Sequence, residues 1–431
     1  MDTPRRTILR GLAAAPFIAG AGGLLLPPTA TAAARRRLTV RTNAPGSGFL
    51  TYRDVIRQLD ARAMTPDHRW GIARAPLDVI LAGSPQRRGV VERLTWPAGS
   101  PPAGETPPLH TVFRWQDDDY GTKDWRPQGI TTNYDSLGGS PARTVLLVSW
   151  DAHPVRAEKQ GTRVSIVDVP AGGAPRYWHV LLVEPEIKHG QPSFKKVELH
   201  AGGLAWYRNL LYVAEFHDSA PNGIRVFDLN HLFSVPATKD VFGYNPGDRK
   251  YYARRYGYVL PQVARYRDTA GDFRYSQLAL ERAGDGSVAR DSLVVSEYQG
   301  PKSSRTPHIA RWELAADGGL ASLTSRETLD IEGTATGIQG AVGVRGTYYL
   351  SMSAGPTGNG HLRTWRPGWG APKPLWRTPP GPEDLSYDRR GNVLWSLGEY
   401  APGDQPRRKD GKRDPKSVYF TRHVYAMRLP S

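Results

Sequence analysis

The sequence predicts an all-β protein of the β-propeller class with a short N-terminal helical segment. From Trp125 onward, short β-type runs recur between Gly, Pro, Asn and Asp residues, with almost no helical periodicity. Five of these segments open in a similar way, and a second β-type run follows each of them. A unit of three or four short strands cannot bury both of its faces alone, so such units are expected to stack around an axis.

Residues 1–34 have the order of a signal peptide. The pair Arg5-Arg6 is followed by an apolar Ala/Gly-rich stretch over 11–26 and a small-residue run that ends at Ala34. A membrane anchor is the alternative, but the apolar run is shorter than the roughly 20 residues that a span needs. Paired arginines are typical of the twin-arginine export route. We therefore expect a secreted, extracellular mature protein without a transmembrane segment.

Residues 35–124 are predicted to form an N-terminal extension, and residues 125–431 the propeller domain. Apolar residues recur at helical spacing within 51–64, which predicts one amphipathic helix. Its apolar positions are Val55, Ile56, Leu59 and Ala63. The Pro/Gly-rich stretch 94–108 reads as a connector, and the basic stretch 407–416 as a mobile charged loop.

The repeated units can be followed strand by strand. Second strands are predicted at 145–150, 211–216, 293–298, 348–352 and 394–400. Third strands are predicted at 163–169, 223–229, 308–314, 361–365 and 423–429, and fourth strands at 177–183, 258–266, 322–329 and 374–376. The last unit lacks a clear fourth strand, which 38–41 or 110–115 could supply. Five blades are counted directly; six or seven blades, or two packed sandwiches, remain alternatives.

Composition narrows the chemistry. The chain has no cysteine, which excludes thiolate catalysis and cysteine-based metal sites. Its formal net charge of +16 favours polyanionic surroundings, although a basic balance is equally consistent with a solubility feature. For an exported protein these surroundings are acidic polysaccharide or an anionic cell-wall polymer, and not nucleic acid. Nothing in the sequence indicates a metal or a particular cofactor, and we expect a monomer.

Polar residues open the first strand of each unit, and first strands line the central channel of a propeller. These residues are Gln128, His200, Gln277, Gln339 and Glu383. Side chains that converge on one axis can form a binding pocket, or they can satisfy exposed backbone through water. We take His200 and Glu383 as candidate catalytic residues, since imidazole and carboxyl groups transfer protons. The three glutamines are candidate substrate-binding residues.

Two further residues are candidates for substrate binding, whereas three glutamates at matching positions are expected to have a structural role. Trp206 could stack on a sugar ring, although most propeller tryptophans are core residues. Arg255 could bind an anionic group, although a solvated loop is equally consistent with its surroundings. Matching second-strand positions hold Glu215, Glu297 and Glu399, each followed by an aromatic residue. Repetition at matching positions predicts a structural role for this set.

The chain resembles a group of exported propeller proteins of high-GC Gram-positive bacteria with similar sequences in fungi. The resemblance covers residues 125–431. It is carried by Trp-Arg-Pro-Gln-Gly-Ile-Thr at 125–131, His-Ala-Gly-Gly-Leu-Ala-Trp-Tyr at 200–207, and Pro-Glu-Asp-Leu at 382–385. It implies the propeller fold and export. The group is largely uncharacterised, so the resemblance implies no catalytic residues.

Two functions fit these observations. One is an enzyme that cleaves an acidic extracellular polysaccharide, as a lyase with His200 as the base or as a hydrolase with two carboxyl groups. Only Glu383 and Asp384 lie in the predicted ring, and neighbouring strand residues point in opposite directions, which favours the lyase. The other function is non-catalytic binding of a glycan or wall polymer. Whether the chain is an enzyme therefore stays open at the level of sequence.

Overall fold

The computed structural model describes residues 36–42, 51–91, 96, 101, 104–135, 143–152, 160–216, 222–285, 288–333, 335–355, 358–404 and 422–430. They belong to one compact unit, Arg36–Ser431. The predicted signal peptide, most of the first half of the predicted connector 94–108, and the basic stretch 407–416 lie outside the described residues. Within the described part, every helix is too short or too polar to cross a lipid bilayer.

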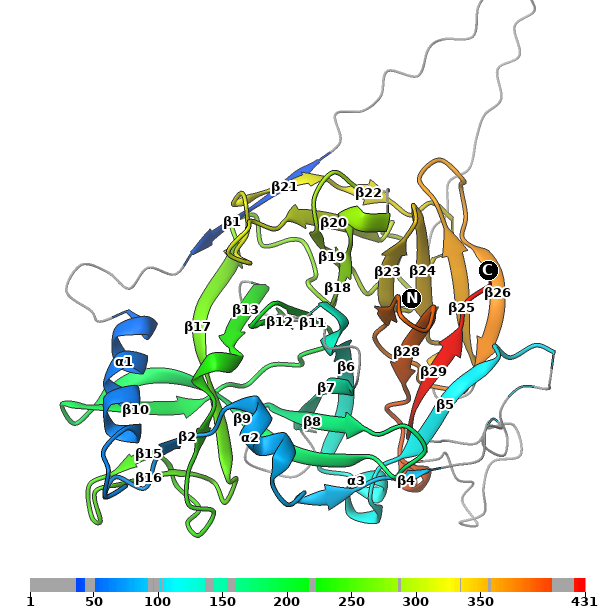
Figure 1. Cartoon of the computed structure of the whole chain (residues 1–431). Coiled ribbons are helices and arrows are strands. Elements are labelled where there is room, and N and C mark those ends of the chain that lie inside the picture. Colours follow the sequence, from blue (N-terminus) through cyan, green and yellow to red (C-terminus); the bar gives the residue numbers. More distant parts are fainter. Residues whose placement is uncertain are drawn as a thin grey trace, which may run out of the picture. The chain divides into compact units, whose positions relative to one another are not determined.

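Five antiparallel four-stranded blades follow one another along the chain (Figure 1). Blade 1 contains β6 (Trp125–Thr132), β7 (Thr144–Ala152), β8 (Arg163–Val169) and β9 (Arg176–Lys188). Blade 2 contains β11 (Leu204–Tyr207), β12 (Leu210–Glu215), β13 (Gly223–Asp228) and β17 (Tyr258–Asp268). Blade 3 contains β18 (Gln277–Glu281), β19 (Ser292–Ser296), β20 (His308–Glu313) and β22 (Leu329–Asp330).

Blades 4 and 5 complete the series. Blade 4 contains β23 (Ile338–Val344), β24 (Thr347–Met352), β25 (Gly360–Trp365) and β26 (Lys373–Thr378). Blade 5 contains β27 (Ser386–Asp388), β28 (Val393–Leu397) and β29 (His423–Arg428), and its fourth strand is β5 (Leu109–Arg114) from the N-terminal side. The pairing of β5 with β29 joins the two ends of the propeller, as the sequence suggested for 110–115.

The five innermost strands form a closed ring. β6 contacts β11, β11 contacts β18, β18 contacts β23, β23 contacts β27, and β27 contacts β6 again. This closure confirms the predicted all-β propeller and sets the number of blades at five. The alternative of two packed sandwiches does not produce such a ring.

Hydrophobic layers between the blades hold the ring together. Side chains alternate along each strand, so every second strand can contribute to two layers. In β7, Leu146 and Val148 pack towards blade 5, whereas Val145 and Leu147 pack towards blade 2. Equivalent layers lie between blades 2 and 3, blades 3 and 4, and blades 4 and 5.

The N-terminal extension packs on the outside of this ring. The predicted helix is α1 (Tyr52–Ala63), and its four predicted apolar residues are buried. Thr51 caps it by accepting a hydrogen bond from the Asp54 backbone N–H. A second helix, α2 (Leu77–Ala82), was not predicted. β1 (Arg37–Thr42) pairs with β17 and with β21 (Thr324–Glu327), so it joins blades 2 and 3 and is not the missing fourth strand of blade 5.

Glycine allows the inner strands to approach one another closely. A Cβ atom on Gly203 would lie 1.9 Å from the Leu278 backbone nitrogen, and one on Gly202 would lie 2.2 Å from the Ser276 carbonyl oxygen. Any side chain at these positions would separate blade 2 from blade 3. The Gly-Gly pair that follows His200 therefore brings these two blades together at the axis.

Candidate active site at the propeller axis

A cavity of about 460 Å³ lies at one end of the axis, and residues from all five blades line it. This volume is within the usual range for ligand pockets. The lining residues are Gln128, His200, Gly202, Phe216, Ser276, Tyr298, Gln339, Glu383 and Glu399. All lie where a first strand begins or a second strand ends, and in an antiparallel pair these positions meet at the same end of the blade.

Four of the five predicted opening residues meet in this cavity: Gln128, His200, Gln339 and Glu383. The exception is Gln277, which is fully buried and donates a hydrogen bond to the Ser296 hydroxyl. Its neighbour Ser276 lines the cavity instead. Successive strand residues point to opposite sides, so the prediction of Gln277 as the cavity residue of blade 3 was wrong by one position.

The other two predicted binding residues lie away from the cavity lining. Trp206 is 4% exposed within the hydrophobic layer between blades 1 and 2, and its indole N–H donates to the Arg208 carbonyl oxygen. Arg255 is an exposed residue of the turn between β16 (Lys250–Ala253) and β17. Trp206 is therefore a core residue and Arg255 a solvent-exposed turn residue, which are the alternatives to substrate binding given for them above.

Two carboxyl groups of blade 5 face the cavity. Glu383 precedes β27 and Glu399 follows β28, and the bridge between Pro382 and Gly398 holds these chain segments together. The Glu383 N–H donates to the Leu397 carbonyl oxygen, and the Glu399 N–H donates to the Gly381 carbonyl oxygen. The backbone therefore fixes both glutamates side by side at the end of one blade.

Neutral groups hold these carboxylates. The Gln339 side-chain amide donates to Glu383 Oε1 at 2.8 Å, and the Gln128 amide donates to Glu399 Oε2 at 3.3 Å. Tyr400 also forms a side-chain hydrogen bond with Glu399. Within the part of the chain that the structure describes, neither glutamate forms an ion pair with a cationic side chain. Their carboxyl groups therefore stay available for chemistry.

The environment favours the neutral form of Glu383. Burial and, next, the negative charge of Glu399 raise the pKa of Glu383 well above its usual value of 4.5. The hydrogen bond from Gln339 opposes this effect without cancelling it. A carboxyl group that stays protonated beside a second carboxylate is suited to act as a general acid.

Asp384, the other acidic residue at this position, has a structural role. It is fully buried, and its Oδ2 atom accepts hydrogen bonds from the backbone N–H groups of Ile130 at 3.1 Å and Leu204 at 3.0 Å. It therefore ties blade 5 to the inner strands of blades 1 and 2. Burial raises the pKa of Asp384 well above its usual value.

His200 faces the cavity with a carboxylate behind it. Its Nδ1 atom lies 3.1 Å from Asp151 Oδ2, and 43% of its side chain is exposed. Burial by the surrounding blades disfavours the charged imidazole, but the hydrogen bond with Asp151 and the negative charges of Asp151 and Glu399 together outweigh it, so the pKa of His200 is raised. The described residues contain no group of three or more His, Asp or Glu arranged to hold a metal ion.

Two arginines lie next to the cavity lining. The guanidinium carbon of Arg274 lies 5.3 Å from the centre of the Phe216 ring, and Phe216 lines the cavity. The charge of Arg126 acts on both His200 and Glu383. Both arginines are half-buried, and neither side chain forms an ion pair within the described residues. The cavity thus combines an aromatic surface with positive charge at two sides.

Glu399 lines the cavity, although the sequence pattern placed it with Glu215 and Glu297 in the set with a structural role. Its counterparts do have the predicted structural role: Glu215 is fully buried between Arg225 and Arg265, and Glu297 accepts from His308 Nδ1 at 2.6 Å. Blade 5 differs because its first strand also opens with a carboxyl residue. That feature was visible in the sequence and could have indicated a pair with Glu383.

Comparisons with known proteins give similarity of fold alone. No protein-family model matches the chain, and no curated protein matches it. Similar solved structures include the GH43_1 enzyme from Xanthomonas citri, with 12% identity over 70% of this chain and 88% of that one and a TM-score of 0.34. PhoX from Pseudomonas fluorescens has 9% identity over 70% and 88%, with a TM-score of 0.35. A gluconolactonase from Xanthomonas campestris has 11% identity over 81% and 99%, with a TM-score of 0.33. Likenesses at this level do not indicate an activity.

Proposed function

We propose that this protein is a glycoside hydrolase that cleaves an acidic extracellular polysaccharide at the axial cavity. The observation that carries the proposal is the pair formed by Glu383 and Glu399 in one cavity, with Glu383 favoured in its neutral form. Glycosidases hold two carboxyl groups roughly 5 to 10 Å apart, one to protonate the leaving oxygen and one to act on the opposite side of the sugar.

In this mechanism Glu383 is the general acid. It donates its proton to the glycosidic oxygen as the bond to the anomeric carbon breaks. Glu399 removes a proton from the attacking water, or attacks the anomeric carbon itself. Gln339 and Gln128 orient the two carboxyl groups through their amide N–H donors. Phe216 and Tyr298 offer aromatic surface on which a sugar ring can stack.

The acidic nature of the substrate is part of the proposal. Arg126 and Arg274 lie beside a cavity whose own titratable groups include two glutamates, and they form no ion pair among the described residues. A half-buried cation without a counter-ion favours binding of an anion. The predicted export signal adds that the substrate would be met outside the cell.

A lyase is the second candidate, because His200 lines the same cavity and Asp151 orients its imidazole. The neutral imidazole would remove the proton next to a uronate carboxyl, and Arg126 or an amide of the ring would stabilise the developing charge. The sequence favoured this mechanism because it offered no second carboxyl group for hydrolysis. Glu399 supplies that group, so the balance moves to hydrolysis.

The test is a panel of uronate-containing and neutral polysaccharides incubated with the purified protein. Hydrolysis gives new reducing ends without ultraviolet absorbance, whereas elimination gives unsaturated uronate products that absorb. We expect reducing ends alone, released from the acidic polymers. Absorbing products would replace the hydrolase with the lyase, and binding without any cleavage would leave only a glycan-binding protein.

A further inference from the structure

A second group of aromatic and cationic residues lies outside the ring of blades. Three guanidinium groups surround Trp70: the central carbons of Arg62, Arg69 and Arg249 lie 4.2, 5.6 and 5.6 Å from its ring centre. Arg62 belongs to the last turn of α1, Arg69 precedes Trp70, and Arg249 lies in the turn between β15 (Phe242–Asn245) and β16. We call Arg62, Arg69, Trp70 and Arg249 the Trp70 cluster.

Neutral contacts build the base of this cluster. The Tyr251 backbone N–H donates to the Trp70 carbonyl oxygen at 3.0 Å, and the Trp70 ring packs against Tyr244 at 6.3 Å between ring centres. Arg62 donates to the Tyr251 hydroxyl at 2.6 Å and to the Gln191 side-chain oxygen. Its guanidinium is therefore fixed in place by uncharged acceptors.

The positive charge of the cluster is almost uncompensated. Among the described residues its arginines form one ion pair, between Arg69 and Asp67 at 3.9 Å, with 57% of the Asp67 side chain and 65% of the Arg69 side chain exposed. Lys250 adds a fourth cation, since its stem packs against Gly71. Asp248 is already engaged by Lys239. Like charges held this close repel one another, so bound anions would stabilise the arrangement.

Two turns with a left-handed backbone lie in this region. Arg249 has a φ of 59°, a left-handed conformation that is unfavourable for residues with a side chain. His68, two residues before Trp70, has a φ of 46°. These conformations persist because the surrounding structure enforces them, and the one at Arg249 fixes the position of this residue in the turn between β15 and β16.

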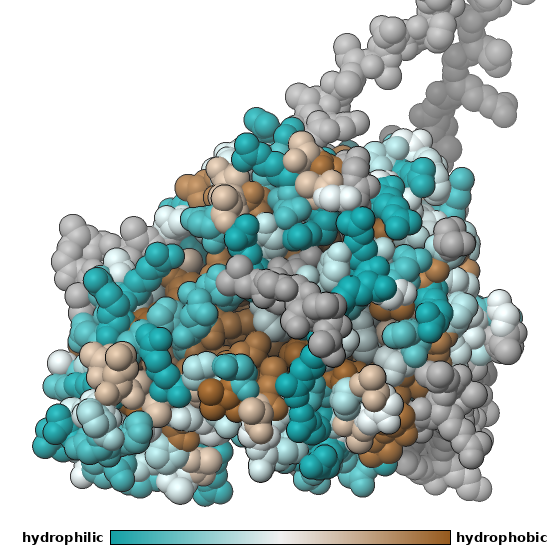
Figure 2. Space-filling model, viewed as in Figure 1, coloured by the Kyte–Doolittle hydropathy of each residue, from teal (hydrophilic) through white to brown (hydrophobic). Residues whose placement is uncertain are grey.

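We propose that the Trp70 cluster is a non-catalytic binding site for a carboxylated polysaccharide. Carboxylates of the polymer would bind to Arg69 and Arg249, and a sugar ring would contact the exposed part of Trp70. The site lies beside α1 and the β15–β16 hairpin, outside the ring of inner strands (Figure 1), in a region where hydrophilic residues predominate (Figure 2). It therefore does not depend on cleavage at the axial cavity.

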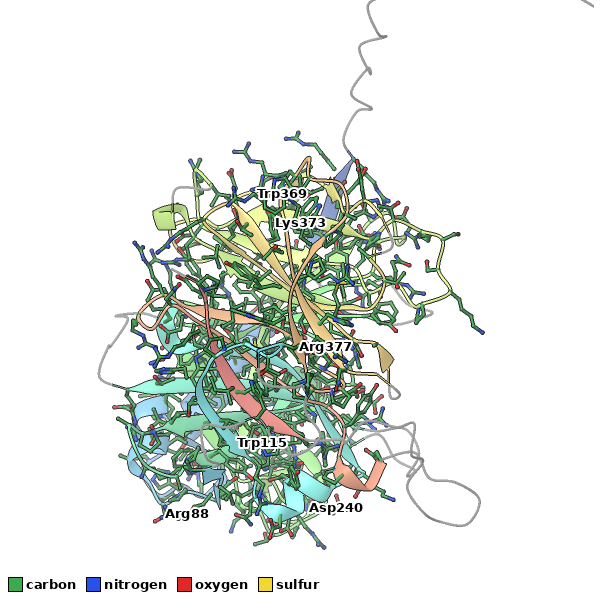
Figure 3. All side chains as sticks on the ribbon, turned by 90° about the vertical axis from the view of Figure 1, so that its right-hand side faces the viewer. Arg88, Trp115, Asp240, Trp369, Lys373 and Arg377 are labelled. Carbon is green, nitrogen blue, oxygen red and sulfur yellow. The ribbon has the colours of Figure 1, made fainter. Side chains whose placement is uncertain are left out.

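The chain contains a matched control. Trp369, 40% exposed in the β25–β26 hairpin, also has two cations near its ring, Lys373 at 4.2 Å and Arg366 at 5.1 Å. Figure 3 shows Trp369 and Lys373 at one end of the molecule and Asp240, which lies two residues before β15, at the other. A double substitution at either place removes two positive charges, so the two variants have the same net charge.

The experiment measures binding of the mature chain to polygalacturonate and to neutral dextran by affinity electrophoresis and calorimetry. We expect Arg69→Ala/Arg249→Ala to weaken polygalacturonate binding about 10-fold or more, and Arg366→Ala/Lys373→Ala to change it less than about 2-fold. Both pairs are measured in a Glu383→Gln background, so loss of cleavage does not enter the result. Dextran is expected not to bind at the cluster.

Three outcomes would overturn the proposal. Equal weakening by both double variants would mean that net charge alone governs binding. Unchanged affinity in Arg69→Ala/Arg249→Ala would remove the site. Equal affinity of the cluster for duplex DNA and for polygalacturonate would remove the polysaccharide as its ligand. Unfolding temperatures of the variants, compared with that of the parent, exclude a change of fold as the cause.

Discussion

Blade 2 and blade 5 each carry a glutamate at the end of the second strand, and the surroundings of the two side chains differ. In blade 2, Glu215 is fully buried and accepts hydrogen bonds from Arg225 and Arg265. In blade 5, Glu399 faces a cavity, and among the described residues its carboxyl group bonds to neutral side chains, those of Gln128 and Tyr400. The repeat determines where the carboxylate lies, and its neighbours determine whether it is neutralised by arginines or faces the cavity beside neutral groups.

The difference follows from what each blade supplies around the carboxylate. Blade 2 provides arginines from its third and fourth strands, β13 and β17, which neutralise Glu215 completely. Blade 5 places a second acidic residue, Glu383, beside Glu399, and no cation pairs with either among the described residues. Two carboxyl groups without counter-ions are unfavourable for folding, and such arrangements are found where function requires them.

The largest expected effect is on activity. Glu383→Gln and Glu399→Gln each keep the shape of the side chain and remove its capacity to exchange a proton. We expect each to lower kcat by roughly 10²- to 10⁴-fold on the polysaccharide that the wild-type protein cleaves, since proton transfer contributes on this scale. Initial rates of reducing-end release give the measurement. A variant that keeps a third of the wild-type rate would remove that glutamate from the mechanism.

The next expected effect is a difference in the free energy of unfolding between substitutions in blade 2 and blade 5. Glu215→Gln leaves Arg265 buried without its carboxylate and leaves Arg225 paired with Glu184 alone, and we expect a loss of roughly 3–5 kcal/mol in the free energy of unfolding. Glu399→Gln removes a charge that has no cationic partner, so its free energy of unfolding should stay equal or rise. Chemical denaturation followed by fluorescence measures both. If the two substitutions cost the same, the contrast between the blades is wrong.

The third effect depends on pH. Because the folded pKa of Glu383 is raised, the native protein binds more protons than the unfolded chain between the usual value of 4.5 and the raised one. The stability due to the neutral carboxyl group is therefore fully present below that usual value and declines as pH rises through the window, by about 1.4 kcal/mol per pH unit crossed. Glu383→Gln cannot ionise and avoids this loss.

We therefore expect the stability of Glu383→Gln relative to wild type to increase from pH 5 towards pH 8. Asp384 ionises in both proteins and cancels from the comparison. Activity of the wild-type protein should fall only at the upper end of this window, where pH passes the raised pKa of Glu383 in the folded protein and the general acid loses its proton. A stability difference that does not change with pH would mean that Glu383 is not protonated in the folded protein.

The architecture was predictable because it rests on local patterns. Short apolar runs between turn residues located the strands of β8, β13 and β20 to within a residue, and the helical spacing of Val55 and Leu59 located α1. The missing fourth strand of blade 5 was narrowed to two segments, and only pairing in three dimensions distinguished β5 from β1. Register between distant segments leaves little trace in a single sequence.

The site, like the fold, was predictable where it depends on local sequence pattern and not where it depends on contacts between distant segments. The rule that first strands line the axis found Gln128, His200, Gln339 and Glu383, which do meet. It missed by one residue at Gln277, because strand alternation near the axis depends on where the ladder starts. The rule could not distinguish the environment of Glu399 from that of Glu215. Glu215 is paired with two arginines that lie ten and fifty residues away from it in sequence.

The smallest expected effect concerns His200, and it decides between the two chemistries of the cavity. In a hydrolase that works through Glu383 and Glu399, His200 only binds and orients substrate, so His200→Ala should lower kcat/KM by about 10-fold, which corresponds to about 1.4 kcal/mol. In a lyase the same change removes the base and should cost roughly 10²-fold or more. Asp151→Asn is the companion variant, since it keeps the imidazole but removes the carboxylate that raises its pKa. A deep loss in His200→Ala together with full activity in Glu399→Gln would reverse the comparison between the blades, because Glu399 would then be as structural as Glu215.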